Sequence, residues 1–218
     1  FLDDIDERVD IVFLCQPNNP TGQLTDLAMV ERILYCCKEC GAVLVVDECF
    51  LDFAAGREAL TAKAFLQEYP NLILIKAFTK LYAMAGVRLG YALCSNTALL
   101  EKMRTAGQPW AVSTLAQAAG TAALDEAAYA DAVRALVAQQ RPVLTSGLRA
   151  LGLRVIEGSA NFLLFCAPAD LGQKLRQRGA VVRSCGNYPG LDATWYRTAV
   201  RTEAENRQLL RLIKEVLE

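Results

Sequence analysis

Three short apolar runs constrain the fold of this chain more than any other feature of its sequence. They cover residues 11–15 (Ile-Val-Phe-Leu-Cys), 42–46 (Ala-Val-Leu-Val-Val) and 72–75 (Leu-Ile-Leu-Ile). Continuous apolar runs of this length are typical of strands buried on both faces of a parallel sheet. Residues 26–40, between the first two runs, have helical apolar spacing and are followed by Gly41, which favours a helix end there. This alternation predicts an α/β fold with a mostly parallel sheet flanked by helices.

The second half of the chain has a different pattern. Residues 97–150 are rich in alanine and predicted to be helical, with a long helix over 127–151 that is bent or broken at Pro142. Strand-like and helical runs then alternate; the strands are 153–156, 161–166, 180–183 and 195–200, and the helices are 170–178 and 203–217. We therefore predict that residues 1–140 form part of a large domain and that residues 141–218 form a small α+β domain.

The amino-acid composition and charge of the chain indicate which kinds of binding partner to expect. Apolar residues make up 53% of the 218 residues, and 23 basic residues nearly balance 24 acidic ones, for a net charge of −1. This balance, with no apolar run of bilayer length, predicts neither a nucleic-acid partner nor a membrane partner. Residues 1–6 carry no basic segment, so we expect no signal peptide, and the absence of an initiator Met favours a chain that starts within a longer protein.

The chain has eight cysteines and no histidine. The cysteines lie mostly inside apolar runs, which is typical of reduced thiols and predicts a cytoplasmic enzyme. Cys37 and Cys40 have C-x-x-C spacing, but without a second pair or any histidine they predict no metal site, and a redox role is a minor alternative. Because histidine is absent, any proton transfer falls to Lys, Asp, Glu, Tyr or Cys.

Residues 76–91 contain the first candidate for chemistry. Lys80 follows the third apolar run in a predicted loop of small and apolar residues, where desolvation favours a nucleophilic amine. Arg88 lies between Gly86 and Gly90, which allow the backbone to approach a bound group closely. A nucleophilic lysine near an arginine suits a phosphorylated aldehyde, and pyridoxal phosphate is such a compound. The alternative is a surface lysine with a structural arginine.

Asp47 is the second candidate. It directly follows the apolar run 42–46, so we expect its carboxylate at the carboxyl end of a central strand. That edge of an open α/β sheet is where ligands bind, and a carboxylate there needs a partner. The alternatives left open are a helix cap and an ion pair in the core.

Four motifs occur in a fixed order along the chain: Asn18-Asn19-Pro20-Thr21-Gly22, Asp47-Glu48-Cys49-Phe50, Thr79-Lys80 with Arg88, and Tyr196-Arg197-Thr198-Ala199-Val200-Arg201. Together they resemble the class I/II aminotransferase family, pyridoxal-phosphate enzymes of fold type I. The resemblance covers nearly the whole chain. It implies the large-domain sheet and small C-terminal domain of that family. The family has a substantial further segment before the first motif, so the N-terminal part of its fold is expected to be absent here.

The resemblance implies roles in cofactor binding. Lys80 matches the lysine that forms the internal aldimine, and Asp47 matches the aspartate that pairs with the pyridine nitrogen. Asn19 matches the asparagine that hydrogen-bonds the phenolic oxygen. Thr79 and Arg88 match phosphate-binding positions. The implied cofactor is pyridoxal 5′-phosphate, and the family also implies a homodimer.

Other positions concern the substrate or depart from the family pattern. Arg197 matches the arginine that binds the substrate carboxylate, a bidentate contact that lysine makes poorly. Ala77 stands where a second phosphate-binding hydroxyl often occurs, so the resemblance implies that this contact is lost. Phe50 stands where most aminotransferases have a tyrosine that contacts the phenolic oxygen.

A narrower resemblance comes from Gln108-Pro109-Trp110 and from residues 183–191 with Tyr196-Arg197. These stretches are similar to the threonine-phosphate decarboxylases of cobalamin biosynthesis, whose near relatives are the histidinol-phosphate aminotransferases. Both kinds of enzyme hold a small phosphorylated amino compound, and Arg183 is similar to a residue that reaches its anionic end. The alternative for Arg183 is a solvated arginine at a strand end.

Three functional hypotheses follow. The first is decarboxylation of L-threonine O-3-phosphate to aminopropanol phosphate through Lys80, with Arg197 and Arg183 orienting the substrate. The second is an aminotransferase of the histidinol-phosphate type, in which Lys80 transfers the proton. The third is an inactive fragment, because the Gly-rich phosphate turn and the ring-stacking aromatic that the family takes from its N-terminal segment are not found in this sequence.

Overall fold

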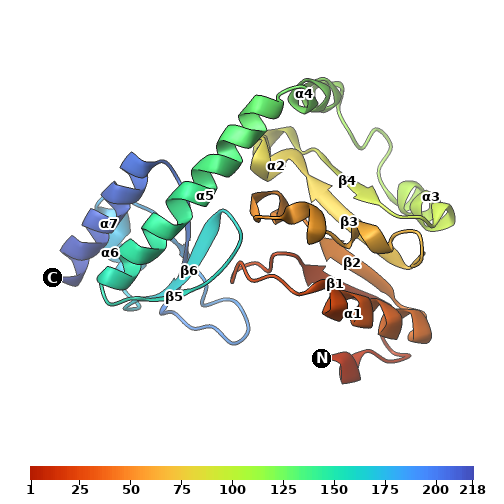
Figure 1. The fold of residues 1–218 in the computed structure, drawn as a ribbon, viewed down its shortest axis with the longest axis horizontal. Coiled ribbons are helices and arrows are strands. Elements are labelled where there is room, and N and C mark those ends of the chain that lie inside the picture. Colours follow the sequence, from red (N-terminus) through yellow and green to blue (C-terminus); the bar gives the residue numbers. More distant parts are fainter. The chain divides into compact units, whose positions relative to one another are not determined.

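A computed structural model describes all residues from 1 to 218, and they divide into two units. The first unit consists of Phe1–Pro17 and Thr25–Ala130, and the second of Asn18–Leu24 and Asp131–Glu218 (Figure 1). The predicted domains, 1–140 and 141–218, stay a prediction; the units divide at a different point, inside a helix, and the second also includes a short loop from the first half of the chain.

The first unit is built on a four-stranded sheet in the order β1-β2-β3-β4. Three strands are parallel, namely β1 (Ile11–Cys15), β2 (Val43–Asp47) and β3 (Leu72–Ala77), and β4 (Gly90–Leu93) lies antiparallel to β3 (Figure 1). The predicted α/β fold with a mostly parallel sheet is therefore confirmed. The parallel strands end together, so residues that follow β2 and β3 meet at one edge of the sheet.

Helix α1 (Leu27–Cys40) packs on one face of this sheet. Its first turn is capped by Asp26, whose side chain accepts the Met29 N–H at 2.7 Å, and it ends at Gly41, which has a left-handed φ of +79°. Alternate strand residues face it. The buried cluster between helix and sheet includes Val30, Ile33, Leu34, Cys37, Leu44, Val46, Leu72 and Leu74. This dry layer holds the carboxyl ends of β2 and β3 in fixed register.

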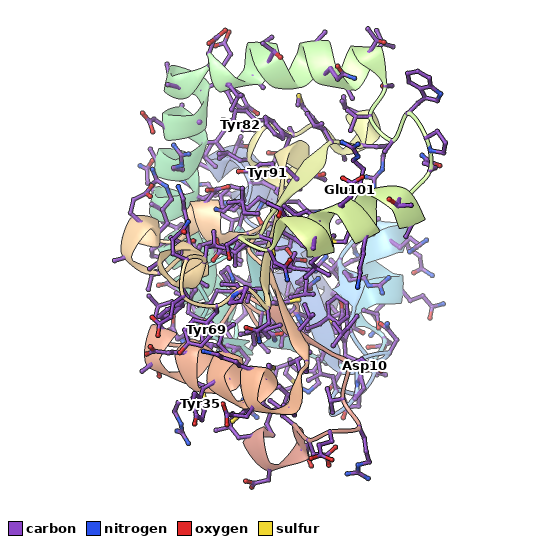
Figure 2. All side chains as sticks on the ribbon, turned by 90° about the vertical axis from the view of Figure 1, so that its right-hand side faces the viewer. Asp10, Tyr35, Tyr69, Tyr82, Tyr91 and Glu101 are labelled. Carbon is purple, nitrogen blue, oxygen red and sulfur yellow. The ribbon has the colours of Figure 1, made fainter.

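Short helices complete the first unit. They are the α-helices α2 (Phe78–Leu81), α3 (Thr97–Ala106) and α4 (Thr114–Leu124), and the 3₁₀ turns Leu2–Asp4, Leu51–Phe53, Arg57–Ala59, Ala62–Phe65 and Ala85–Val87. Figure 2 shows Tyr35 and Tyr69 beside α1, and Tyr82 and Tyr91 together at the other end of the unit. Lys38 of α1 lies 5.5 Å from the ring centroid of Tyr69.

The second unit has an antiparallel sheet in the order β5-β6-β8-β7. Its strands are β5 (Arg154–Ile156), β6 (Phe162–Cys166), β7 (Arg183–Ser184) and β8 (Trp195–Ala199), and its helices are α5 (Ala127–Ala150), α6 (Leu171–Gln177) and α7 (Glu203–Leu217). Buried side chains of all three helices form the core with β6; they include Leu144, Leu148, Leu171, Leu175, Ile213 and Phe165.

Two local predictions need correction. Helix α5 continues across Pro142, so it is not broken there. The strand predicted over 180–183 is reduced to β7, because the chain leaving α6 turns through Gly179 at a φ of +80° and the Ala180 N–H still bonds back to Leu175. Measured against the length and hydropathy that a bilayer crossing requires, every helix of the chain falls short.

Candidate active site

Lys80 lies in α2, which follows β3 without an intervening loop. Its side chain is exposed, and Nζ lies 5.2 Å from the ring centroid of Phe50. The predicted loop position and the predicted burial of this amine are therefore both wrong. A cation over an aromatic face gains about 0.5–1 kcal/mol at an exposed site. The ring thus orients the ammonium while leaving it accessible to a small aldehyde.

Asp47 is the last residue of β2 and is half-buried. Its Oδ1 accepts the backbone N–H of Cys49 at 2.9 Å, which closes a tight turn after the strand. Asp47 neither caps a helix nor forms an ion pair, so both structural alternatives for it are wrong. Because no cation in the structure forms an ion pair with it, the negative charge of Asp47 can attract a protonated ring nitrogen of a ligand.

Cys49 connects Asp47 with Lys80. Burial raises the pKa of the Cys49 thiol to about 12, and a hydrogen bond to Asp47 and the charge of that carboxylate act in the same direction. The positive charge of Lys80 opposes them, so both groups are close enough to act on one sulfur atom. The sheet places both predicted catalytic residues at its carboxyl edge, with Asp47 at the end of β2 and Lys80 in α2 directly after β3. Sequence analysis missed Cys49, although its place two residues after an aspartate is a common signal for such a turn.

Thr79 and Arg88 line one cavity of about 390 Å³, together with Lys76 and Tyr91. Arg88 has a left-handed φ of +59°, and its Nη1 donates to the carbonyl oxygen of Ala85 at 3.0 Å. Arg88 as a whole is exposed. A hydroxyl and a forked cation on one cavity wall are groups that bind phosphate oxygens well.

In the second unit, Arg197 of β8 is bound to Asn19. Its Nη1 donates to Asn19 Oδ1 at 2.5 Å, and its guanidinium lies 4.9 Å from the ring centroid of Phe162. The hydroxyl of Tyr188 donates to the same Asn19 oxygen at 3.5 Å. These contacts hold one edge of the guanidinium and leave other N–H groups for a bidentate partner such as a carboxylate.

Arg183 of β7 lies directly opposite Arg197 of β8 in the antiparallel register. Residues paired in this way project from the same face of the sheet. Arg183 is exposed, as expected for an arginine at a strand end, and its Nη2 donates to Asn187 Oδ1 at 3.3 Å. Like charges directly opposite each other are unfavourable unless an anion binds to them. The pair therefore favours a ligand with two negative groups or one negative group shared between the arginines.

The predicted site residues fall into two groups, each described within its own unit. Asp47, Thr79, Lys80 and Arg88 belong to the first unit; Asn19, Arg183 and Arg197 belong to the second. The assigned roles of these seven residues stay predictions. Tyr188 was part of a motif in the sequence, but its bond to Asn19 links residues far apart in the chain and was not predicted.

A comparison with family models decides the identity of the chain. The model for "Aminotransferase class I and II" matches residues 1–213. The chain belongs to the class I and II aminotransferases. The predicted family and fold are thereby confirmed, and both the motif order and the sheet of the first unit agree with this membership.

Named relatives point to two activities. A threonine-phosphate decarboxylase of Salmonella typhimurium is 36% identical over 99% of this chain and 60% of its own length. A histidinol-phosphate aminotransferase of Symbiobacterium thermophilum is also 36% identical, over 95% of this chain and 56% of its own. The chain thus spans somewhat less than two thirds of the length of these curated relatives.

A solved structure identifies the cofactor. The histidinol-phosphate aminotransferase of Sinorhizobium meliloti in complex with pyridoxal 5′-phosphate superposes with a TM-score of 0.82, at 26% identity, over 96% of this chain and 58% of that one. Pyridoxal 5′-phosphate is the cofactor of this family, which confirms the prediction. The donor set of the first unit fits it: an accessible amine for the aldehyde, a carboxylate for the ring nitrogen, and a hydroxyl and guanidinium for the phosphate.

Proposed function

We propose that this chain carries the cofactor lysine and the substrate arginines of a pyridoxal-phosphate-dependent decarboxylase. Its substrate is L-threonine O-3-phosphate, and its products are CO₂ and aminopropanol phosphate, as in cobalamin biosynthesis. The observation that carries the proposal is the register of β7 and β8, which sets Arg183 opposite Arg197. Two arginines on one sheet face suit a substrate that has a carboxylate at one end and a phosphate at the other.

The residues of this chain have separate tasks in this proposal. Bound pyridoxal phosphate supplies the ring that accepts the electrons of the broken Cα bond. Lys80 would hold the cofactor through its amine at the aldehyde and would supply the proton that the substrate Cα needs after CO₂ has left. Asp47 keeps a proton on the ring nitrogen by its negative charge. Arg88 and Thr79 hold the phosphate of the cofactor.

In this proposal, residues of the second unit decide which bond of the substrate Cα is broken. Arg197 binds the substrate carboxylate with the N–H groups that Asn19 does not occupy. Arg183 binds the substrate phosphate, and its contact with Asn187 orients the guanidinium. Holding both ends of a short substrate fixes the rotation about its Cα, and this orientation decides whether the carboxylate or the hydrogen is lost. We also propose, by analogy with the family alone, that the working protein is a cytoplasmic homodimer.

The second candidate is an aminotransferase acting on histidinol phosphate or a similar amino compound. It is favoured by the Symbiobacterium relative, whose identity equals that of the Salmonella decarboxylase. The same two arginines would bind the substrate of this aminotransferase. In that reaction Lys80 would move the Cα proton, and a keto acid would be required as the second substrate. The remaining alternative is an inactive chain. Covalent attachment of the cofactor to Lys80 would contradict that alternative.

The deciding experiment is product analysis with the full protein that contains this chain. After loading with pyridoxal phosphate, we expect CO₂ and aminopropanol phosphate from threonine phosphate without any keto acid. Borohydride reduction should fix the cofactor to Lys80, as mapped by mass spectrometry. Amino transfer to 2-oxoglutarate without release of CO₂ would support the aminotransferase hypothesis. Absence of a cofactor adduct at Lys80 would support the hypothesis of an inactive chain.

Arginine variants test how the substrate is held. Removing one partner of a desolvated charge pair costs about 2–5 kcal/mol, or roughly 30- to 5,000-fold in affinity. Arg197→Gln should weaken every carboxylate substrate by a factor in this range. Arg183→Gln should weaken threonine phosphate while sparing threonine itself. Arg176→Gln, at an exposed position of α6, is the matched control and should change neither. Equal losses for both substrates in Arg183→Gln would refute phosphate recognition by this residue.

A further inference from the structure

A fully buried carboxylate lies beside the candidate site and has no task in the proposed chemistry. Glu48 follows Asp47 and is 0% exposed. Its Oε1 accepts the Ala62 N–H at 2.8 Å, and its two oxygens lie 2.8 and 3.0 Å from the donating hydroxyl of Thr61. An isolated charge at such a position is unfavourable, so a buried carboxylate requires both donors and a counter-charge.

Lys76 supplies that counter-charge. Its Nζ lies 3.4 Å from Glu48 Oε2 and 3.8 Å from Asp52 Oδ1, and its side chain is only 19% exposed. Lys76 of β3 is paired with Tyr91 of β4, which is labelled in Figure 2. Lys76 stands four residues before Lys80 and at the start of the segment that leads directly into α2.

The backbone reinforces this ionic contact. The N–H of Glu48 donates to the carbonyl oxygen of Ile75 at 2.9 Å, so main chain and side chain of one residue both bind the end of β3. On the β2 side, the neighbours of Glu48 are Asp47 and Cys49, which are joined by their own hydrogen bond. The contact therefore links the two short segments that carry Asp47 and Lys80.

We propose that Glu48 is a positioning residue that acts through Lys76 to hold Asp47 and Lys80 in their mutual orientation. The catalytic consequence rests on the proposed function, whereas the positioning itself does not. Glu48 touches neither reacting group. By fixing the end of β2 to the end of β3, it keeps the carboxylate turned toward the N–H of Cys49 and keeps the first turn of α2, with its amine, in place.

The first test uses amide hydrogen exchange on the protein without cofactor. In Glu48→Gln the amide oxygen still accepts from Thr61 and Ala62, but the charge facing Lys76 is lost. We expect the Cys49 amide, which donates to Asp47, to exchange at least tenfold faster. The Leu44 amide, which donates to Asn71 within the sheet, should change less than twofold because the fold is retained.

Further variants separate positioning from general stability. Lys76→Met should accelerate exchange at Cys49 to the same extent as Glu48→Gln, and the double variant should add little because both changes break one contact. Lys63→Met, an exposed lysine without a carboxylate partner, is the matched control and should have no effect. Equal acceleration at Cys49 and Leu44, or no acceleration at Cys49, would overturn the proposal.

The second test uses the loaded full protein. We expect Glu48→Gln to lower kcat at least tenfold with KM changed less than threefold, since the substrate arginines lie elsewhere in the chain. Unchanged kcat would overturn the catalytic part of the proposal. If the wild-type protein does not decarboxylate threonine phosphate while Cys49 exchange still responds to Glu48→Gln, the proposed function fails and the positioning role stands.

Discussion

Gly158 provides a test of how the segment that carries Asn19 is held. A Cβ at this position would lie 2.8 Å from Thr21 O, 2.9 Å from Gly22 Cα and 3.0 Å from the Gly22 carbonyl carbon. All three atoms belong to the backbone, so no side-chain rotation relieves the clash. The φ of Gly158 is not left-handed, so alanine fits the local conformation, and the cost of Gly158→Ala comes from this contact alone.

The size of the effect follows from two terms. Overpacking of a tight contact costs about 1–3 kcal/mol. Displacement of the loop also breaks the hydrogen bond from Ser159 N to Gly22 O, 2.7 Å long, for about 1 kcal/mol more. Together these give about 2–4 kcal/mol. At roughly 2–4 °C per kcal/mol for a protein of this size, the melting temperature of the protein should fall by about 4–16 °C.

The assay is thermal unfolding followed by circular dichroism, with Gly107→Ala as the matched control. A Cβ at Gly107 would meet its nearest neighbour at 3.4 Å, so that variant should stay within about 0.5 kcal/mol of wild type. Gly158→Ala should also weaken carboxylate binding, because the displaced loop removes the Asn19 oxygen from Arg197. Equal melting temperatures for the two variants would show that the loop is not held by this contact.

Three further outcomes are expected. At pH 8, iodoacetamide should label Cys49 about a thousandfold more slowly than a thiol of pKa 9.0, measured by peptide mass spectrometry, because its pKa is raised to about 12. Because the folded state retains the thiol proton more strongly than the unfolded state, the stabilisation from Cys49 should be complete below pH 9 and lost between pH 9 and 12. Cys49→Ala should abolish this pH dependence of the unfolding free energy, measured by urea titration. Thr202→Ala removes the side-chain part of the capping box of α7 and should destabilise the second unit by about 1 kcal/mol in urea unfolding. Hydrogen bonds from Arg201 and then from Thr202 lower the pKa of Glu205 to about 2, so the stabilisation from these two contacts should be present above pH 4.5 and decline toward pH 2.

The sequence predicts those parts of the fold that depend on local pattern. The runs at 11–15, 42–46 and 72–75 are continuous and apolar, and each becomes a strand of the first sheet. The position of Asp47 at a strand end follows from the same pattern, because the strand ends one residue after the apolar run. The order of the four motifs along the chain predicts the family, which no single motif identifies.

Other features depend on distant parts of the chain and escaped the sequence analysis. The residues around Lys80 in the sequence are apolar, but its amine is exposed and lies over Phe50, thirty positions away, because α2 starts directly after β3. Glu48 looked like part of a motif, whereas its donors come from Thr61 and its counter-charge from Lys76 on the next strand. Such contacts arise from tertiary packing, which local periodicity does not encode.

The loop Asn18–Leu24 leaves β1 in the first unit, belongs to the second unit, and returns to the first before α1. The second unit is therefore discontinuous in sequence and cannot be produced as the single stretch 131–218. That stretch would leave Arg197 without the oxygen that it binds and would uncover Gly158. A truncation placed in α5, where the two units divide, thus removes Asn19, and with it part of the proposed substrate site, together with the first unit. A circular permutant that joins the loop to residue 131 would keep the second unit whole in one piece of chain.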